Sequence, residues 1–447
     1  MSLRGADNES DEATAIGRSA LLKASWRLLP LIGLGYGVSY IDRVNISFAS
    51  LQMNRDLHFS AAVYGLGAGL FFLTYALFEV PSNLLLVRFG ARRWIARIML
   101  TWGVLAAAML FVKTPMQFYL MRLLLGAAEA GFFPGVIFYL SQWFPAAHRG
   151  RAISRFYVAL PLGTVVMGAM AGALLDLQGR LGLAGWQWLF LVEGVPAVLL
   201  SAAFLVLLPD KPQDARWLTA REQGWIVDRL AEEAARPGAE RGHGVLRALL
   251  DPVVIRFAAV NFLFLGPLYA FNLSAPAVLD SFTHLGATRV GYLTALAGLL
   301  GAGSMLLNSW SSDRQQERYV HLIAPLVTLG LAYAVMGLTN SPLLAISAYC
   351  VAVMSNMAIS PVIWLAPGEA IQPSTAAASI AAINSIGQLG SFVFPTLWGL
   401  AKDQTGGFHL GLTLLPIPFF LAAAIVLSER RRARRTGAAE TLVLASG

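Results

Sequence analysis

Long apolar stretches separated by short polar ones are the dominant pattern along the chain. Residues 290–312, 319–368 and 370–401 contain no Asp, Glu, Lys or Arg. A helix needs about 20 apolar residues to cross the hydrocarbon core of a membrane, and each of these stretches is at least that long. The middle stretch is long enough for two helices, and the turn signal TNSP at 339–342 divides it. The pattern therefore predicts an all-α membrane protein.

The same reading of the whole chain predicts twelve transmembrane helices in two six-helix halves. A polar segment, residues 209–250, separates the halves, and we expect an amphipathic helix at about 217–233 within it. The loops RFGARR and DRQQER, at 88–93 and 313–318, follow the second span of each half, as a duplication would produce. The twelve predicted spans are 26–48, 61–86, 94–112, 116–140, 152–175, 186–208, 255–279, 290–312, 320–339, 342–366, 374–400 and 408–428.

Composition and charge support this class and give an orientation. Of the 447 residues, 57% are hydrophobic and 13% are charged, about half the charged fraction of a soluble domain. Arginines gather after the second, fourth, eighth and twelfth spans, which predicts that both termini are cytoplasmic and that the protein lies in the inner (plasma) membrane. Attraction to an anionic inner leaflet explains the net charge of +8, so we expect lipid and no nucleic acid as a partner.

This orientation completes the predicted division of the chain. The polar first 20 residues lack the basic start and short apolar core of a cleaved signal peptide. The predicted parts are a cytoplasmic N-terminal tail (1–25), an N-terminal half (26–208), a cytoplasmic linker (209–250), a C-terminal half (251–428) and a basic cytoplasmic C-terminal tail (429–447).

Signs of an enzyme or a metal site are missing from the sequence. The single cysteine, Cys350, lies in a predicted span and excludes an internal disulfide and a cysteine-based metal site. The chain has no HExxH motif and no nucleophile elbow. We therefore predict a protein that is not an enzyme and that holds neither a cofactor nor a metal.

Four charged residues inside predicted spans are the strongest functional signal: Asp42, Arg43, Arg122 and Glu129. A charge at the centre of a membrane helix costs about 2.5–3.5 kcal/mol on insertion scales, so such residues face a cavity or a partner. Arg122 and Glu129 are two helical turns apart on one face, and we expect Asp42 at a similar depth as their shared partner. The alternative is that these residues form ion pairs that only hold helices together.

Several strings in the sequence resemble the anion:cation symporter branch of the major facilitator superfamily, and the resemblance covers essentially all of residues 25–428. Val87 stands where the wider superfamily has an Asp before the basic loop, a variant also seen in this branch. The strings are YIDRVNISFA (40–49), EVPSNLLLVRFGARRWIARIMLTWG (79–103), RLLLGAAEAGFFPG (122–135), EGVPAVLL (193–200), LPDKPQDARWLT (208–219) and AAINSIGQLGSFVFP (381–395).

The resemblance implies a carrier with the major facilitator fold that takes up a small organic carboxylate anion together with protons. Sugar acids, tartrate, phthalate and hydroxyphenylacetate-type acids are the implied substrates. It implies proton coupling by Asp42 and Glu129 with Arg122 in their charge network, and it places the substrate carboxylate on Arg43. The further positions that it implies for substrate binding are Tyr40, Tyr75, Asn272, Ser360, Trp364 and Asn384.

The residues themselves leave some of these assignments open. Without the resemblance, helix packing explains Tyr40, Tyr75 and Trp364 equally well. Ser274 stands where many relatives have an aromatic residue, which leaves the identity of the anion open. An organic-anion exporter or exchanger is the alternative function, and a nutrient sensor on the same scaffold is a more distant one. A monomer is the family expectation.

Overall fold

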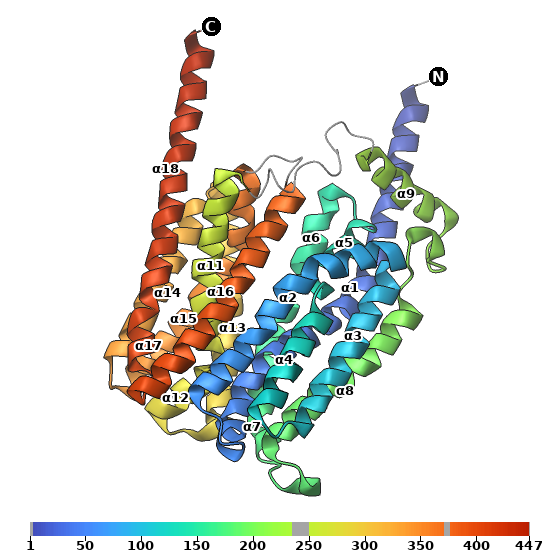
Figure 1. Ribbon diagram of the computed structural model, residues 1–447. Coiled ribbons are helices and arrows are strands. Elements are labelled where there is room, and N and C mark those ends of the chain that lie inside the picture. Colours follow the sequence, from blue (N-terminus) through green and yellow to red (C-terminus); the bar gives the residue numbers. More distant parts are fainter. Residues whose placement is uncertain (1–2, 235–249, 371–375, 447) are drawn as a thin grey trace.

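The computed structural model describes residues 3–234, 250–370 and 376–446. Almost all of these residues are helical, and the helices lie side by side in two groups (Figure 1). The elements of the first group are α1 (Leu3–Asp56), α2 (Ala61–Phe89), α3 (Ala91–Ala108), η1 (Met109–Phe111), α4 (Pro115–Glu129), α5 (Phe132–Ser141), α6 (Ala146–Tyr157), α7 (Ala159–Leu175), η2 (Arg180–Gly182) and α8 (Gly185–Leu207).

A short connecting region and the second group follow. The elements of the connection are η3 (Pro212–Asp214) and α9 (Ala220–Ala234), and α9 coincides with the amphipathic helix expected at 217–233. The helices of the second group are α11 (Pro252–Asn272), α12 (Ala275–Thr283), α13 (Gly286–Gln315), α14 (Tyr319–Leu338), α15 (Pro342–Ala370), α16 (Ala376–Thr405), α17 (His409–Leu414) and α18 (Pro416–Ser446).

The all-α membrane class and the arrangement in two six-helix halves are confirmed. Within the described residues, eleven spans are long and apolar enough to cross a membrane. Helix α1 is not among them, because Asp42, Arg43 and Asn45 interrupt its apolar run. It nevertheless passes through the first half, packed against α7 and α8, which shield its polar centre from lipid. Helix α1 therefore completes the first set of six.

Three of the predicted spans, 116–140, 152–175 and 255–279, contain a short break, at prolines that the sequence marks as possible kinks, and the first two are still found as single membrane spans, Pro115–Ser141 and His148–Leu175. Each is broken into two helices about four residues before a proline: Pro134, Pro161 or Pro276. Proline has no amide hydrogen and its ring clashes with the carbonyl four residues earlier, which opens the helix there. At the first break Gly131 takes a positive φ of 88°, which glycine adopts without strain. Pro395, by contrast, stays inside the continuous helix α16.

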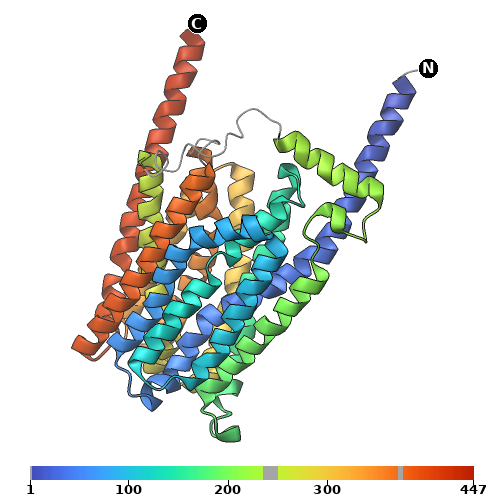
Figure 2. The ribbon, with the colours of Figure 1, turned by 45° about the vertical axis from the view of Figure 1, so that its right-hand side comes forward.

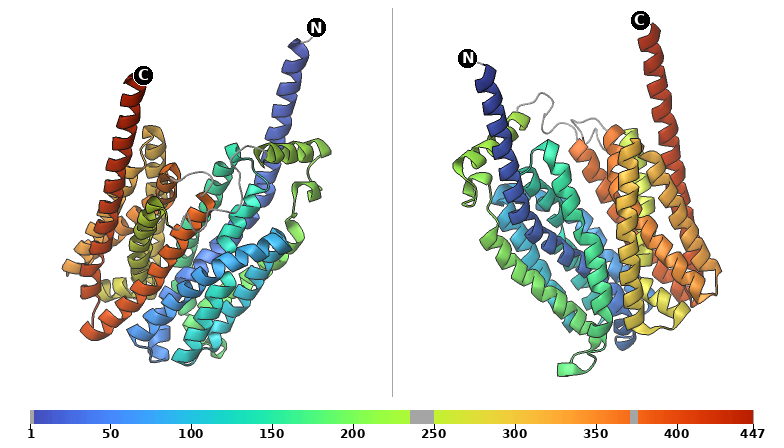
Figure 3. Two further views of the ribbon diagram at one scale, coloured as in Figure 1. Left: turned by 45° about the horizontal axis from the view of Figure 1, so that its top comes forward. Right: turned by 180° about the vertical axis from the view of Figure 1, so that it is seen from behind.

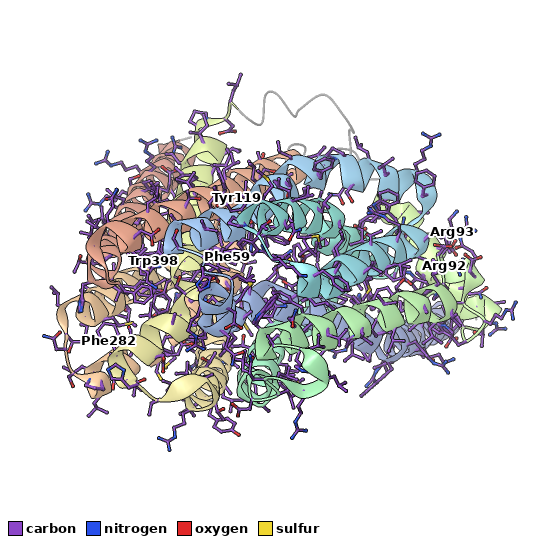
Figure 4. All side chains as sticks on the ribbon, turned by 60° about the horizontal axis from the view of Figure 1, so that its bottom comes forward. Phe59, Arg92, Arg93, Tyr119, Phe282 and Trp398 are labelled. Atoms are coloured by element: carbon purple, nitrogen blue, oxygen red, sulfur yellow. The ribbon has the colours of Figure 1, made fainter. Side chains whose placement is uncertain are left out.

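Both chain ends lie at the same end of the bundle (Figures 1 and 3). The segments expected to be tails continue as helix, since α1 starts at Leu3 and α18 runs to Ser446. The beginning of α1 projects beyond the bundle beside α9, as Figure 2 shows. We call this end of the molecule the terminal end and the opposite one the distal end. Figure 4 turns the distal end forward, with Phe59 on the first half and Trp398 on the second.

The two halves contact each other closely at the distal end, where α2 packs against α16 and α7 against α13. At the second crossing a Cβ atom on Gly168 would lie 2.6 Å from the carbonyl oxygen of Gly291, so only glycine fits. At the first, the carboxylate of Asp403 accepts hydrogen bonds from the backbone amides of Ala61 (2.9 Å) and Ala62 (2.8 Å). We call the contacts of Ala61, Ala62, Gly168, Gly291 and Asp403 the distal seam.

Candidate functional site

A cavity of about 200 Å³ lies between the two halves and is lined by both. The first half contributes residues from α1, α2, α5, α6 and α7, and the second from α11, α12, α13, α15 and α16. All seven residues predicted for substrate binding line it: Tyr40, Arg43, Tyr75, Asn272, Ser360, Trp364 and Asn384. The structure thus brings them together in one place, while their roles stay predictions.

Arg43 is the one charged residue among the described residues that line this cavity. Its Nε and Nη2 atoms both lie 2.8 Å from Oε1 of Glu129, which is fully buried. The hydroxyl of Ser39 donates to the same oxygen at 2.7 Å. The guanidinium also lies 4.8 Å from the ring centre of Tyr75, within cation–π distance. Arg43 is therefore held toward the cavity by its partners, and its charge is neutralised from behind by Glu129.

The predicted bridge between Arg122, Asp42 and Glu129 was wrong in its details. Glu129 pairs with Arg43 rather than through a partner shared with Arg122. Arg122 donates to the carbonyl oxygen of Ala68 at 3.4 Å and lies 4.7 Å from the ring centre of Phe71. The reason is that two turns along α4 separate Arg122 from Glu129, so that each side chain meets different neighbours.

Asp42 lies behind the cavity and not in its lining. Adjacent residues on a helix point about 100° apart, so Asp42 faces the interior of the first half while Arg43 faces the cavity. Asp42 is 3% exposed, and its Oδ2 atom has no hydrogen-bond partner. It is close enough to Arg122 and Glu129 to interact with both electrostatically. Asp42 thus lies close to both Arg122 and Glu129, while the role of these three residues in proton coupling stays a prediction.

Two buried acids escaped the sequence analysis. Glu79 of α2 is 6% exposed and accepts hydrogen bonds from the amide of Asn384 on α16, at 2.8 and 3.0 Å. Glu193 of α8 is 5% exposed, neither of its oxygens has a hydrogen-bond partner, and it interacts electrostatically with Asp42. Both are single acids inside predicted spans, so the criterion that identified Asp42 would have found them if applied to every span.

An anion that takes over the Nε and Nη2 atoms of Arg43 would change the partners of Glu129. A carboxylate that enters the cavity meets one cation, and that cation already holds Glu129. If the ligand takes over Arg43, Glu129 is left as a buried carboxylate with only Ser39 as a partner. A buried carboxylate without a cation is costly, and taking up a proton removes that cost. The geometry thus places the cation of the cavity lining in direct contact with a buried acid, and the role of that acid in proton coupling stays a prediction.

Comparison with known proteins gives a consistent result. Residues 32–395 match the model of the Major Facilitator Superfamily. A putative tartrate transporter from Agrobacterium vitis is 44% identical over 91% of this chain and 89% of its own length. A quinolone resistance transporter from Acinetobacter baumannii is 39% identical over 90% and 92%. Among solved structures, a bacterial homologue of the human lysosomal transporter Spinster superposes with a TM-score of 0.74 at 17% identity, over 91% of this chain and 97% of that one.

Proposed function

This chain belongs to the major facilitator superfamily, and we propose that it carries a small organic carboxylate anion across the inner membrane together with protons. The observation that carries the proposal is the pairing of Arg43, the charged residue in the cavity lining, with the buried Glu129 at 2.8 Å. In this proposal the anion displaces Glu129 from Arg43, and the displaced acid binds a proton. Substrate and proton therefore occupy the protein together, as symport requires.

The lining supports a substrate with further polar groups. Tyr40, Asn272, Ser360 and Asn384 supply hydroxyls and amides around the cavity, and Trp364 supplies a flat apolar face. A hydroxylated carboxylate such as tartrate or a sugar acid matches this set, and one relative is named as a putative tartrate transporter.

Alternating access is the proposed mechanism, with the structure representing the inward-facing state. The distal seam joins the halves at the end opposite the termini, so that end is the outer one if both termini are cytoplasmic. Transport then requires the seam to part and the halves to close at the terminal end. Protonation of Asp42 and Glu129 would prepare the site for the anion, with Arg122 balancing the charge of Asp42.

Export is the second candidate. A relative that is 39% identical is named as a quinolone resistance transporter, which favours outward movement of a substrate on this scaffold. The direction of net flux in proteoliposomes under an imposed pH gradient separates the two candidates. Uptake driven by an acidic outer solution supports symport, and net movement of the anion against the proton flow supports export by exchange.

The test of coupling is the variant Glu129→Gln, with tartrate and a sugar acid as first substrates chosen by thermal-shift screening. We expect loss of uptake driven by the pH gradient, with anion exchange at zero gradient retained, because the amide cannot release a proton. Glu232→Gln, which removes an exposed acid of α9, is the matched control and should transport normally. Normal gradient-driven uptake by Glu129→Gln would contradict the coupling role.

A further inference from the structure

A second cavity, of about 600 Å³, lies at the terminal end, outside the centre of the bundle. It is formed by residues 14–25 of α1, by α6 and by α9, and Figure 2 shows α9 beside the projecting start of α1. Arg18, Arg151, Arg155 and Arg229 line it together with His148. No acidic side chain is among the residues described as lining it. The cavity is therefore strongly basic.

Two described acids of α9 are engaged with basic residues that do not line the cavity. Glu222 of α9 accepts from Lys23 of α1 at 2.8 Å, and Glu233 of α9 accepts from Arg149 of α6 at 2.8 Å. These two bridges fasten α9 to both neighbouring helices, and none of their four residues lines the cavity. Arg229 does pair with Glu232 at 2.8 Å, but both side chains are more than half exposed. The two salt bridges thus hold α1, α6 and α9 together, and we call these three helices the frame. Arg18, Arg151 and Arg155 line the cavity within it.

Apolar side chains complete the lining. Leu21, Leu22, Phe144 and Trp225 stand beside the arginines. Leu22 is 48% exposed, and Trp26, one turn further along α1 toward the bundle, is 78% exposed. The cavity thus continues into apolar surface at the level where α1 enters the bundle, and exposed tryptophan is typical of the membrane interface. A free inorganic anion would leave this apolar side of the cavity unused.

We propose that this cavity binds an anionic glycerophospholipid. The phosphate lies between Arg18 of α1 and the two arginines of α6, Arg151 and Arg155, since a guanidinium donates two parallel hydrogen bonds to phosphate oxygens. The first part of the acyl chain packs against Leu22 and continues along the apolar surface toward Trp26. Basic pockets between helices on the cytoplasmic side suit such headgroups. The bound lipid joins α1 to α6 and so stabilises the frame that holds the connection between the halves.

The experiment uses the full chain purified in a neutral detergent. Its thermal midpoint is measured with added phosphatidylglycerol, with phosphatidylcholine and with inorganic phosphate. A ligand that binds the folded state raises the midpoint in a saturable way. We expect this from phosphatidylglycerol alone. In Arg151→Gln/Arg155→Gln the apparent affinity should fall about fivefold for each arginine, which corresponds to about 1 kcal/mol per basic residue near an anionic surface.

The control variant is Arg434→Gln/Arg435→Gln, which removes the same charge from exposed positions of α18 at the same end of the molecule. It should respond to phosphatidylglycerol as the unmodified protein does. An equal response to phosphatidylcholine, or an unchanged response in the α6 variant, would overturn the proposal. A full response to inorganic phosphate would also overturn it, in favour of a site for a free anion.

A second variant guards against a folding defect. If the α6 double variant is unstable without lipid, Arg18→Gln, on a different helix, provides the same test with one charge removed. It should weaken the response to phosphatidylglycerol about fivefold, and an unchanged response would overturn the proposal. Transport of the organic anion is not measured in any of these arms, so their outcome is independent of the proposed function.

Discussion

The first half of the molecule concentrates ionisable side chains in its interior, whereas the second half, where described, lines the same cavity with amides and hydroxyls. Asp42, Glu79, Arg122, Glu129 and Glu193 are all at most 6% exposed. In the second half the buried polar groups facing the cavity are uncharged, among them Asn261 and Gln388.

The charged Glu429 of the second half pairs with Arg256 at 2.6 Å, away from the cavity. The difference teaches that the buried ionisable groups near the cavity belong to one half, while the other half supplies shape and uncharged polar groups. In the proposed function, proton binding and release would therefore alter one wall of the cavity only. A direct connection between the halves beside the cavity is the pair Glu79 and Asn384, in which a charged group of the first half meets a neutral amide of the second.

Replacing Arg43, the charged residue of the cavity lining, should have the largest effect on the difference between the two halves. Arg43→Ala leaves Glu129 buried without its cation, a change that costs about 3–5 kcal/mol when the remaining group stays charged. We expect loss of anion-dependent thermal stabilisation and of uptake. Arg43→Ala/Glu129→Gln should recover most of the unliganded stability but no anion binding. Anion affinity retained in the single variant would remove Arg43 from the substrate site.

Placing a charge in the cavity wall of the second half should have the next largest effect on stability and transport. Asn384→Asp places a second carboxylate against Glu79, so we expect a loss of about 1–3 kcal/mol in stability and slower transport. The swapped pair, Glu79→Gln/Asn384→Asp, restores one donor and one acceptor and should recover both. A thermal midpoint and transport rate unchanged by Asn384→Asp would show that the halves do not depend on this connection.

The substitution Glu193→Gln should have a smaller effect on stability and transport, because an uncharged amide replaces a carboxyl group that we expect to be uncharged. Neither carboxyl oxygen of Glu193 has a hydrogen-bond partner. Because a buried carboxylate without partners is costly, we expect Glu193 to hold a proton. An amide in its place should change stability by about 0.5 kcal/mol or less and leave the proton-to-anion ratio unaltered. A lower ratio would make Glu193 a carrier of the transported proton.

The smallest expected effect lies outside the membrane, at Glu222. Burial alone would raise the pKa of this carboxyl, but hydrogen bonds from Lys23, from the backbone of Thr219 and from Ser19 lower it to about 2. Because the folded pKa is lower than the unfolded one, its stabilisation is present above the ordinary pKa near 4.5 and is lost as the pH falls toward 2.

Glu222→Gln should reduce the loss of stability between about pH 5 and pH 3, by less than about 1 kcal/mol because Lys23 is 43% exposed. Thermal midpoints at several pH values measure the difference from the unmodified protein. An identical pH dependence in both proteins would contradict the contribution of this bridge.

Much of the fold could be predicted from the sequence, since lipid allows few alternatives to apolar helices of a set length. The cavity-lining residues around Arg43 could also be predicted from the sequence, because charged residues in membrane spans are rare and the motifs around them are specific. The pairing of Arg43 with Glu129 was not, because it depends on how α1 is rotated against α4. The helix breaks before Pro134 and Pro161 follow a known rule, but that rule does not tell them apart from Pro395, which stays within helix α16.

The cap that Asp403 places on the first turn of α2 has a consequence for the speed of the carrier. Its partners are two backbone amides at an exposed helix end, so water can replace the carboxylate as soon as the halves begin to part. Parting the distal seam therefore exchanges hydrogen bonds to the carboxylate for hydrogen bonds to water, with little net change in free energy. Arg43 and Glu129 are 13% and 0% exposed, so bulk water does not replace their contact in the same way. In the proposed transport cycle we expect the exchange of this pair with the anion, rather than the parting of the seam, to limit the rate.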